Sequence, residues 1–342
     1  FTPDESRREF RKNERDPIKA DAIIIDEVSM VDILLMHSLL KAVEPGTRLI
    51  LVGDADQLPS VGPGRVLSDL IESRCFKVIR LNNIFRQAGE SFIVVNAHRI
   101  NKGLFPELNT ENEDFFFIPR NSPQSTAQTV LELCTTRIPE KFGLDPMKDI
   151  QVLSPSKKGD AGIYALNVLL QEKLNPPAAG VKEKNFRGVI FRENDRVMQV
   201  KNNYNLSWEM ADEYSKTVFG EGVFNGDMGI IREIDPDGGY LTVQFDDGKT
   251  VEYDFDMLDE LEHSYAITVH KSQGSEFPAV VVALSGVPPM LRLRNLLYTA
   301  ITRARKLVVL VGDAEILKQM VNNVTERERY TGLRERIAHF FE

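Results

Sequence analysis

The chain has 342 residues, 42% of them hydrophobic and 27% charged, and carries a net charge of −9. This length is typical of about two domains, and the composition is that of a soluble globular protein, which excludes a disordered tail, a collagen-like rod and a disulfide-stapled miniprotein. No apolar run approaches the ~18–20 residues needed to cross a bilayer. The first residues do not form a signal peptide, and because no initiator Met is present we expect a piece of a longer protein.

The net negative charge disfavours nucleic acid as a partner but does not exclude it, because a basic channel can lie on an acidic body. Cys75 and Cys134 lie far apart without CxxC spacing, which predicts a reducing, cytoplasmic compartment and no zinc knuckle. The five histidines form neither HxxxH nor HExxH, so we expect no zinc site.

The clearest pattern lies near the start of the chain. Residues 22–25 form an unbroken apolar run, typical of a strand buried on both faces. Ser29 is expected to cap a helix over 31–43. A second buried strand is predicted at 49–52, and a loop rich in Pro and Gly at 55–65. Strand, helix and buried strand in succession predict a βαβ unit with parallel strands.

Most of the remaining chain repeats this alternation of buried strands and amphipathic helices. The predicted strands are 77–81, 115–118, 150–153, 279–284 and 307–311. The predicted helices are 88–102, 122–135, 161–174, 291–304, 313–322 and 326–341. The fold class is therefore α/β with parallel sheets.

One region differs from this pattern. Residues 186–262 carry short alternating strands and tight turns, which predict a small antiparallel barrel inserted between α/β segments. Residues 204–222, which contain Trp208, are expected to be a flexible excursion within it. The expected domains are the C-terminal remnant of a first α/β domain at 1–73, a second α/β domain at 74–184 with 263–342, and the inserted barrel at 185–262.

Two acids follow the first predicted strand. A carboxylate pair at the carboxyl end of a parallel strand lies where such sheets bind ligands. Asp26 suits a Mg²⁺ ligand and Glu27 suits a group that orients or deprotonates water, as nucleoside triphosphate hydrolysis requires. The alternative is a pair of acids that simply start a helix, where the helix dipole favours them.

A neutral amide follows the second strand. Gln57 lies in the segment 53–64, beside the acids, and is suited to contact a γ-phosphate and respond to its loss. The alternative is an ordinary turn-rich loop.

Two arginines are candidates for stabilising charge on a transferring phosphoryl group. Arg86 lies in residues 84–87 and Arg303 lies in residues 298–305. The alternative for either is a surface salt bridge, and we assign Arg305 and Lys306 to the surface. The sequence contains no GxxxxGK(S/T) phosphate loop, since the one Gly-Lys-Thr, at 248–250, falls on a predicted hairpin turn.

Residues 266–277 combine hydroxyl groups, an imidazole and a lysine near a predicted helix start. Such a set is suited to a phosphate backbone. The alternative is a capped helix with incidental polar side chains. The residues concerned are Thr268, His270, Lys271 and Ser272.

In this order, these segments resemble the motifs of superfamily 1 DNA helicases, with the strongest similarity to the RecD/TraA branch. The resemblance spans roughly residues 20–312. The segments similar to motifs II to VI are DEVSM (26–30), GDADQLPSVGPG (53–64), NIFRQA (83–88), VHKSQGSEF (269–277) and YTAITRARK (298–306).

The resemblance implies two RecA-like motor domains with ATP bound between them, and a Src-homology-3-like (SH3-like) barrel inserted in the second. It implies 5′→3′ movement on single-stranded DNA, unwinding at duplex junctions, and a role in repair or recombination that can include subunits of a nuclease complex. No membrane partner is implied. The implied roles are a Mg²⁺ ligand (Asp26), a catalytic base (Glu27), a γ-phosphate sensor (Gln57), arginine fingers (Arg86, Arg303) and contacts to the nucleotide (Gly274, Glu276). The implied DNA contacts are Pro59, Val61, Gly62, Asn202, Asn203, Thr268, His270, Lys271 and Ser272.

The sequence departs from the family pattern in one respect, because motif I would lie upstream of Asp26, where only about twenty residues precede it. We therefore expect this chain alone to bind ATP and Mg²⁺ weakly or not at all. Two alternatives stay open: the helicase part of a conjugative relaxase, and a non-catalytic DNA-binding module.

Overall fold

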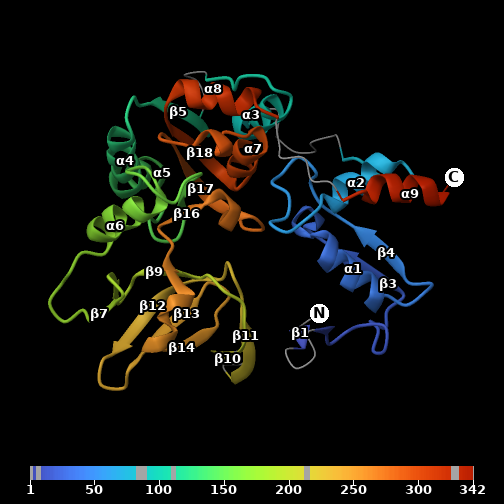
Figure 1. Cartoon of the computed structure of the whole chain (residues 1–342). Helices are drawn as coiled ribbons and strands as arrows, with labels where there is room; N and C mark the ends of the chain where they lie inside the picture. The colour runs from blue at the N-terminus through green and yellow to red at the C-terminus, as the bar shows by residue number, and fades with distance from the viewer. Residues whose placement is uncertain are drawn as a thin grey trace. The chain divides into compact units, whose positions relative to one another are not determined.

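The computed structural model describes residues 3–4, 9–81, 91–108, 113–211, 216–324 and 331–341. The chain divides into two compact units (Figure 1). The first unit comprises Phe1–Pro106, Leu293–Thr299 and Met320–Glu342, and the second comprises Glu107–Arg292 and Ala300–Gln319. Within the part of the chain that is described, no helix has the length and apolar character needed to span a membrane.

The first unit is built on a two-stranded parallel sheet. Strands β3 (Ala22–Ile25) and β4 (Arg48–Leu51) pair in parallel and are joined through the short helix η1 (Val28–Met30) and helix α1 (Ile33–Ala42), which confirms the predicted βαβ unit. Its other elements are β1 (Pro3–Asp4), β2 (Glu9–Phe10), α2 (Val66–Ser73), α3 (Phe92–Asn101) and α9 (Leu333–Phe341).

Two details of this unit differ from the prediction. Among the described residues only one face of the sheet is packed, so Ile24 is 67% exposed, and its register partner Ile50 is exposed as well. The cap of α1 is Asp32, whose Oδ1 accepts from Leu35 N at 2.8 Å. Ser29 lies in η1 instead, because the chain makes a separate turn before α1 begins.

The predicted strand at 77–81 is wrong. These residues form no helix or strand, and Leu81 is 93% exposed. A short apolar run carries no information about whether a neighbouring strand is available to pair with it. The helix predicted over 88–102 is confirmed as α3, and its residues 88–90 lie outside the described residues.

The second unit has a five-stranded parallel sheet in the order β16-β6-β17-β18-β5. Its strands are β5 (Phe115–Pro119), β6 (Ile150–Ser154), β16 (Ala266–Thr268), β17 (Phe277–Leu284) and β18 (Ala304–Gly312). Its helical elements are α4 (Pro123–Glu132), η2 (Leu133–Arg137), α5 (Ile138–Phe142), α6 (Ile163–Leu174), η4 (Val269–Ser272) and η5 (Pro289–Leu291). Helix α7 (Arg294–Thr302) belongs to the first unit up to Thr299, and helix α8 (Ala314–Asn322) belongs to the second unit up to Gln319. Side chains of α4 and α6 share one core with β6, β17 and β18.

The inserted barrel is a seven-stranded antiparallel sheet in the order β11-β10-β14-β13-β12-β9-β15. Its strands are β9 (Arg196–Gln199), β10 (Asn203–Ala211), β11 (Thr217–Val223), β12 (Met228–Asp235), β13 (Tyr240–Phe245), β14 (Thr250–Asp254) and β15 (Leu261–His263). The hairpin β7 (Glu183–Phe186)–β8 (Val189–Arg192) precedes it, and η3 (Phe255–Glu260) joins β14 to β15. The lysine of the Gly-Lys-Thr segment lies at the turn between β13 and β14, as predicted.

The flexible excursion predicted at 204–222 is wrong. Residues 203–211 and 217–223 pair as the antiparallel strands β10 and β11, with Trp208 opposite Gly220. A Cβ on Gly220 would lie 2.2 Å from the Trp208 ring, so the glycine gives the indole room to lie across the partner strand. The described part of this segment is therefore a regular hairpin.

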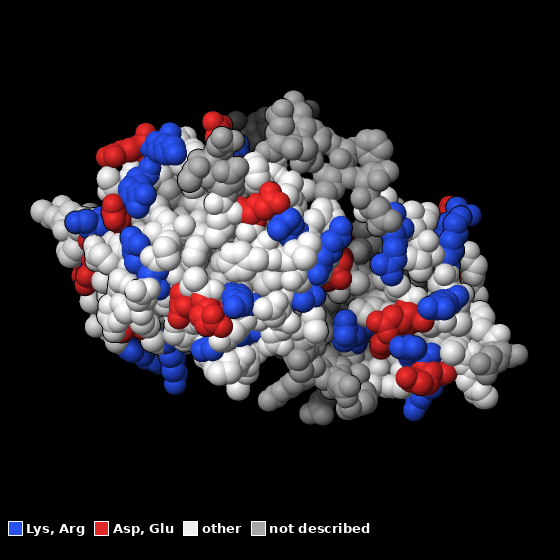
Figure 2. Space-filling model, turned by 90° about the horizontal axis from the view of Figure 1, so that it is seen from above, with Lys and Arg blue, Asp and Glu red and all other residues white. Residues whose placement is uncertain are grey.

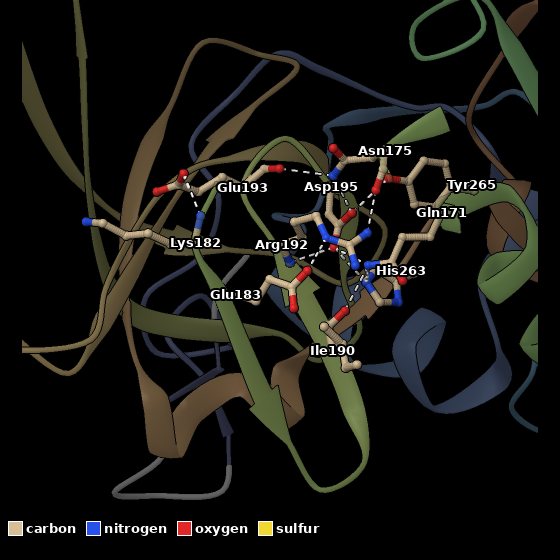
Figure 3. A network of polar contacts seen from close by, with 10 residues as sticks. All are labelled: Gln171, Asn175, Lys182, Glu183, Ile190, Arg192, Glu193, Asp195, His263 and Tyr265. Atoms are coloured by element: carbon tan, nitrogen blue, oxygen red, sulfur yellow. Dashed lines mark hydrogen bonds and ion pairs between the residues drawn. The ribbon is translucent and has the colours of Figure 1, made fainter. Parts of the chain in front are cut away.

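A buried carboxylate joins the barrel to the α/β sheet (Figure 3). Asp195, which is 0% exposed, accepts from Gln171 of α6, from Asn175 just after α6, from Arg192 N and from the Tyr265 hydroxyl, at 2.6–2.9 Å. His263 Nε2 lies 3.0 Å from the same carboxylate. We call these six residues the Asp195 network.

Candidate functional site

The two acids predicted as catalytic lie at the carboxyl end of β3. Asp26 Oδ1 accepts from Glu27 N at 2.7 Å. Glu27 adopts φ 52° and ψ 38°, a left-handed conformation that costs a non-glycine residue roughly 1–2 kcal/mol. Its carbonyl accepts from Met30 N at 2.9 Å. Strain of this kind is typical of residues that a site holds in a required orientation.

The segment after β4 lies directly against these acids. Val28 N donates to Val52 O at 3.0 Å. A Cβ on Gly53 would lie 3.0 Å from Val28 N and 3.2 Å from Ser29 N, so only glycine allows this approach without displacement of the backbone. The predicted adjacency of the acids and the Gly53–Gly64 loop is therefore present.

Gln57 is oriented by a neighbouring carboxylate. Gln57 Nε2 donates to Asp54 Oδ2 at 3.2 Å, and the same oxygen accepts from the Tyr298 hydroxyl at 3.0 Å. One residue further along each segment, Leu58 N donates to the buried Thr299 Oγ1 at 2.9 Å. Helix α7 thus contacts the loop that carries Gln57 through two hydrogen bonds. Sequence reasoning did not identify Asp54, Tyr298 or Thr299 as site residues.

The predicted DNA-contacting loop follows Gln57. Val61 is highly exposed, and Pro59 is half-buried beside a small hollow that Ser29 and Gln57 also line. Gly62 lies so close to Asp32 that a Cβ there would meet the Asp32 carboxylate at 1.9 Å.

Of the two predicted arginine fingers, Arg86 lies outside the described residues. Arg303 is buried, and its guanidinium donates to Ser275 O at 3.2 Å and to Thr302 Oγ1 at 3.4 Å. Gly274 has φ +76°, which favours glycine. Glu276 forms an exposed ion pair with Arg305 at 2.8 Å.

The predicted phosphate-contacting residues lie on and before η4. Thr268 Oγ1 caps this turn by accepting from Lys271 N at 3.3 Å. Ser272 is fully buried and donates to Val269 O at 2.8 Å, so its hydroxyl serves the turn. Burial lowers the pKa of His270, so its imidazole is neutral at pH 7. Burial also lowers the pKa of Lys271, whose ammonium group donates to Asn225 Oδ1.

Asn202 and Asn203 lie where the barrel hairpin begins. Asn202 Oδ1 accepts from Asn225 N at 2.9 Å, which places Asn202 beside the partner of Lys271. Asn203 Nδ2 is directed to Glu260, at 3.1 Å. Lys201 forms an ion pair with Asp259 and thereby lowers the pKa of that carboxyl group.

Asp26 fits a Mg²⁺ ligand by its chemistry. Magnesium ions at nucleotide sites are bound by one or two carboxylates together with water and substrate phosphates. Asp26 is exposed, and within the described chain its Oδ2 accepts no hydrogen bond from the protein. Groups of three or more His, Cys, Asp or Glu suited to a metal do not occur among the described residues.

Charge on the surface is mixed. On the face in Figure 2, lysine and arginine side chains lie among aspartate and glutamate side chains. A binding surface for an anionic polymer on this face would therefore use individual basic residues at defined positions.

Comparison with known proteins extends these observations. Three family models match: an AAA domain at residues 8–114, the SH3 domain of ATP-dependent RecD-like DNA helicases at 166–245, and a UvrD-like helicase C-terminal domain at 263–311. The Bacteroides Pif1 helicase, in a crystal structure with ADP-AlF3 and single-stranded DNA, aligns over 100% of this chain and 82% of its own. The TM-score is 0.52 at 20% identity, which supports the fold alone.

The fold is that of a superfamily 1 helicase, with RecA-like parallel sheets and an inserted SH3-like barrel. The ATP-dependent RecD2 DNA helicase of Deinococcus radiodurans is 36% identical over 96% of the chain and 42% of its own length. The RecBCD enzyme subunit RecD of Mycolicibacterium smegmatis is 30% identical over 98% of the chain and 57% of its own length. The chain belongs to the RecD-like family of superfamily 1 helicases, and it spans roughly half the length of these relatives.

Proposed function

We propose that the chain carries part of an ATP-driven motor that moves 5′→3′ along single-stranded DNA and opens duplex junctions, with a role in DNA repair or recombination. The observation that supports this best is the contact between two motifs in the first unit. The strained Glu27 lies next to Asp26, and the loop that positions Gln57 packs against the same turn through Gly53.

We assign each role in ATP hydrolysis to a residue of this chain. Mg²⁺, when bound, would neutralise phosphate charge, and Asp26 would hold it. Glu27 would accept a proton from the attacking water, and Gln57 would donate to the γ-phosphate. Arg86 and Arg303 would stabilise charge that develops in the transition state. Gly274 and Glu276 would approach the nucleotide.

Single-stranded DNA would be bound mainly through its backbone and stacked bases, so binding would tolerate sequence and weaken with salt. We assign this contact to Pro59, Val61 and Gly62 in the first unit. In the second unit we assign it to Asn202, Asn203, Thr268, His270 and Lys271, and not to Ser272, whose buried hydroxyl serves the turn. The acidic net charge requires these contacts to be local.

Because the sequence has no GxxxxGK(S/T) segment, we propose that this chain alone does not turn over ATP. The test is steady-state phosphate release with and without oligo-dT. We expect no rate above that of the Glu27→Gln variant, and rapid DNA-stimulated turnover would show that the phosphate site is misplaced.

A second experiment tests the proposed motor activity on a longer protein. A longer protein that contains this sequence together with a GxxxxGK(S/T) segment should hydrolyse ATP and unwind a duplex with a 5′ overhang. Glu27→Gln should reduce the hydrolysis rate of that protein by at least about 10²-fold. Unwinding from a 3′ overhang alone would contradict the proposed direction.

A further inference from the structure

Two aromatic rings lie together at the base of the barrel hairpin. Tyr204 of β10 and Phe224, just after β11, contact edge to face, with centroids 5.6 Å apart and planes at 69°. Phe224 remains 39% exposed. Gly222 has φ +102°, and a Cβ there would lie 3.0 Å from the Phe224 ring. The ring is therefore held against a glycine, with part of its surface open to solvent.

The turn that carries Phe224 is fixed on both sides. Phe224 N donates to Asp227 Oδ2 at 2.8 Å, and Asp227 N donates back to Phe224 O at 3.0 Å. Gly226 N donates to Gln199 O at 2.9 Å, which ties the turn to β9. A ring on such a turn loses little conformational freedom when a ligand binds.

Lys271 is connected to these rings through two amides. Its ammonium group donates to Asn225 Oδ1, and Asn225 N donates to Asn202 Oδ1 at 2.9 Å. Asn202 Nδ2 in turn donates to the Tyr204 hydroxyl at 3.3 Å. Hydrogen bonds thus connect the cation, the two amides and Tyr204, and the ring contact adds Phe224. We call this group the Phe224 cluster: Asn202, Tyr204, Phe224, Asn225 and Lys271.

We propose that the Phe224 cluster is a stacking site for one base of single-stranded DNA. The open part of the Phe224 ring receives the base, Tyr204 supports that ring from its edge, and Lys271 binds an adjacent phosphate. A flat apolar surface beside a cation matches the alternation of base and phosphate in a single strand. This inference rests on the proposed function, and it adds a binding role for Phe224, Tyr204 and Asn225.

The first test is fluorescence anisotropy of a labelled oligo-dT with this chain. Phe224→Leu keeps an apolar side chain and removes the aromatic face, and we expect it to weaken binding at least about fivefold. Phe219→Leu is the matched control, because Phe219 is an exposed phenylalanine of the same barrel, at 74%. It should change the affinity less than twofold. Equal circular dichroism and Trp208 fluorescence would show that both variants are folded.

The second test separates stacking from charge. The wild-type chain should bind oligo-dT more tightly than an abasic strand of equal length, and Phe224→Leu should lose most of this preference. Lys271→Gln should lower the dependence of log K on log salt by ~0.7 for one phosphate, whereas Phe224→Leu should leave this slope unchanged.

The outcomes distinguish failure of the proposed DNA-binding function from failure of the stacking site alone. If the wild-type chain binds no oligonucleotide, the proposed DNA-binding function fails, and the stacking site fails with it. If the wild-type chain binds but Phe224→Leu matches it on both oligo-dT and the abasic strand, only the stacking site is overturned. Equal losses for Phe219→Leu and Phe224→Leu would also overturn it, because the effect would not be local.

Discussion

The Tyr298 hydroxyl donates to Asp54 Oδ2, and that oxygen also accepts from the amide of Gln57. Tyr298 lies on α7, and Arg303 follows the end of the same helix. The glutamine proposed to contact the γ-phosphate is therefore positioned by a carboxylate that α7 also binds. This arrangement gives Tyr298 a positioning role that its place in the sequence did not reveal.

Tyr298→Phe removes this hydrogen bond and leaves the ring in place. We expect it to lower the stability of the first unit by about 1 kcal/mol. Hydrogen exchange of the backbone amides at 54–60 should become faster, since Leu58 N is held by the adjacent Thr299. Tyr164→Phe, on the exposed side of α6, is the control and should change neither quantity. Unchanged exchange at 54–60 in Tyr298→Phe would contradict the positioning role.

Asp195→Asn should destabilise the second unit by about 2–4 kcal/mol. The substitution keeps the shape of the side chain but replaces one acceptor oxygen with an NH₂ group among buried donors. Urea unfolding monitored by Trp208 fluorescence measures the effect. Glu252→Gln, an exposed charge-neutralising change on β14, is the control and should stay within ~0.5 kcal/mol. Equal stabilities of the two variants would show that the Asp195 network contributes little.

Gly62→Ala should displace Asp32 from its capping position, because the added Cβ would overlap the Asp32 side chain. The loss of the cap on α1 is worth ~1 kcal/mol, and Asp32→Ala should cost about the same. If the cap is the shared cause, the double variant should cost little more than either single variant. Additive losses in urea unfolding would refute this explanation.

Burial raises the pKa of Cys134 to about 12. Its thiol therefore stays protonated through pH 10 in the folded protein, and alkylation by iodoacetamide should occur only on unfolding. Because the folded pKa lies above the unfolded value of 9.0, stability should fall as pH rises from about 9 towards 12. Cys75 is half-buried and should react first. Mass spectrometry after alkylation at pH 8 and pH 10, with and without urea, distinguishes the two thiols.

Strands that consist of a short apolar run between turn residues could be predicted from the sequence. Residues 22–25, 150–153 and 307–311 became parallel strands because mostly apolar runs lose most by exposure to water. Residues 77–81, in which Lys77 and Arg80 lie among apolar residues, form no strand, since pairing depends on partners that a local pattern does not specify.

One feature was missed although its signal is present in the sequence, and a second was missed because its pattern is ambiguous. Tyr204, Leu206, Trp208 and Met210 alternate with more exposed residues, which is the strand period that β10 confirms. Asn167 and Gln171 lie on the buried face of α6, and Asn175 follows four residues later, just after the helix ends. Polar residues are ordinarily assigned to solvent, so this pattern gives no warning until Asp195 is seen to face it.

The Asp195 network also limits how freely the barrel can be exchanged in evolution or by engineering. Excision of residues 185–262 would remove the one carboxylate that Gln171, Asn175 and Tyr265 share, and would leave their polar groups in an apolar interior. A graft of the barrel into another host would need α6 and the strand before η4 to travel with it. The barrel is one continuous segment of the sequence, but the residues on which its packing depends extend beyond that segment.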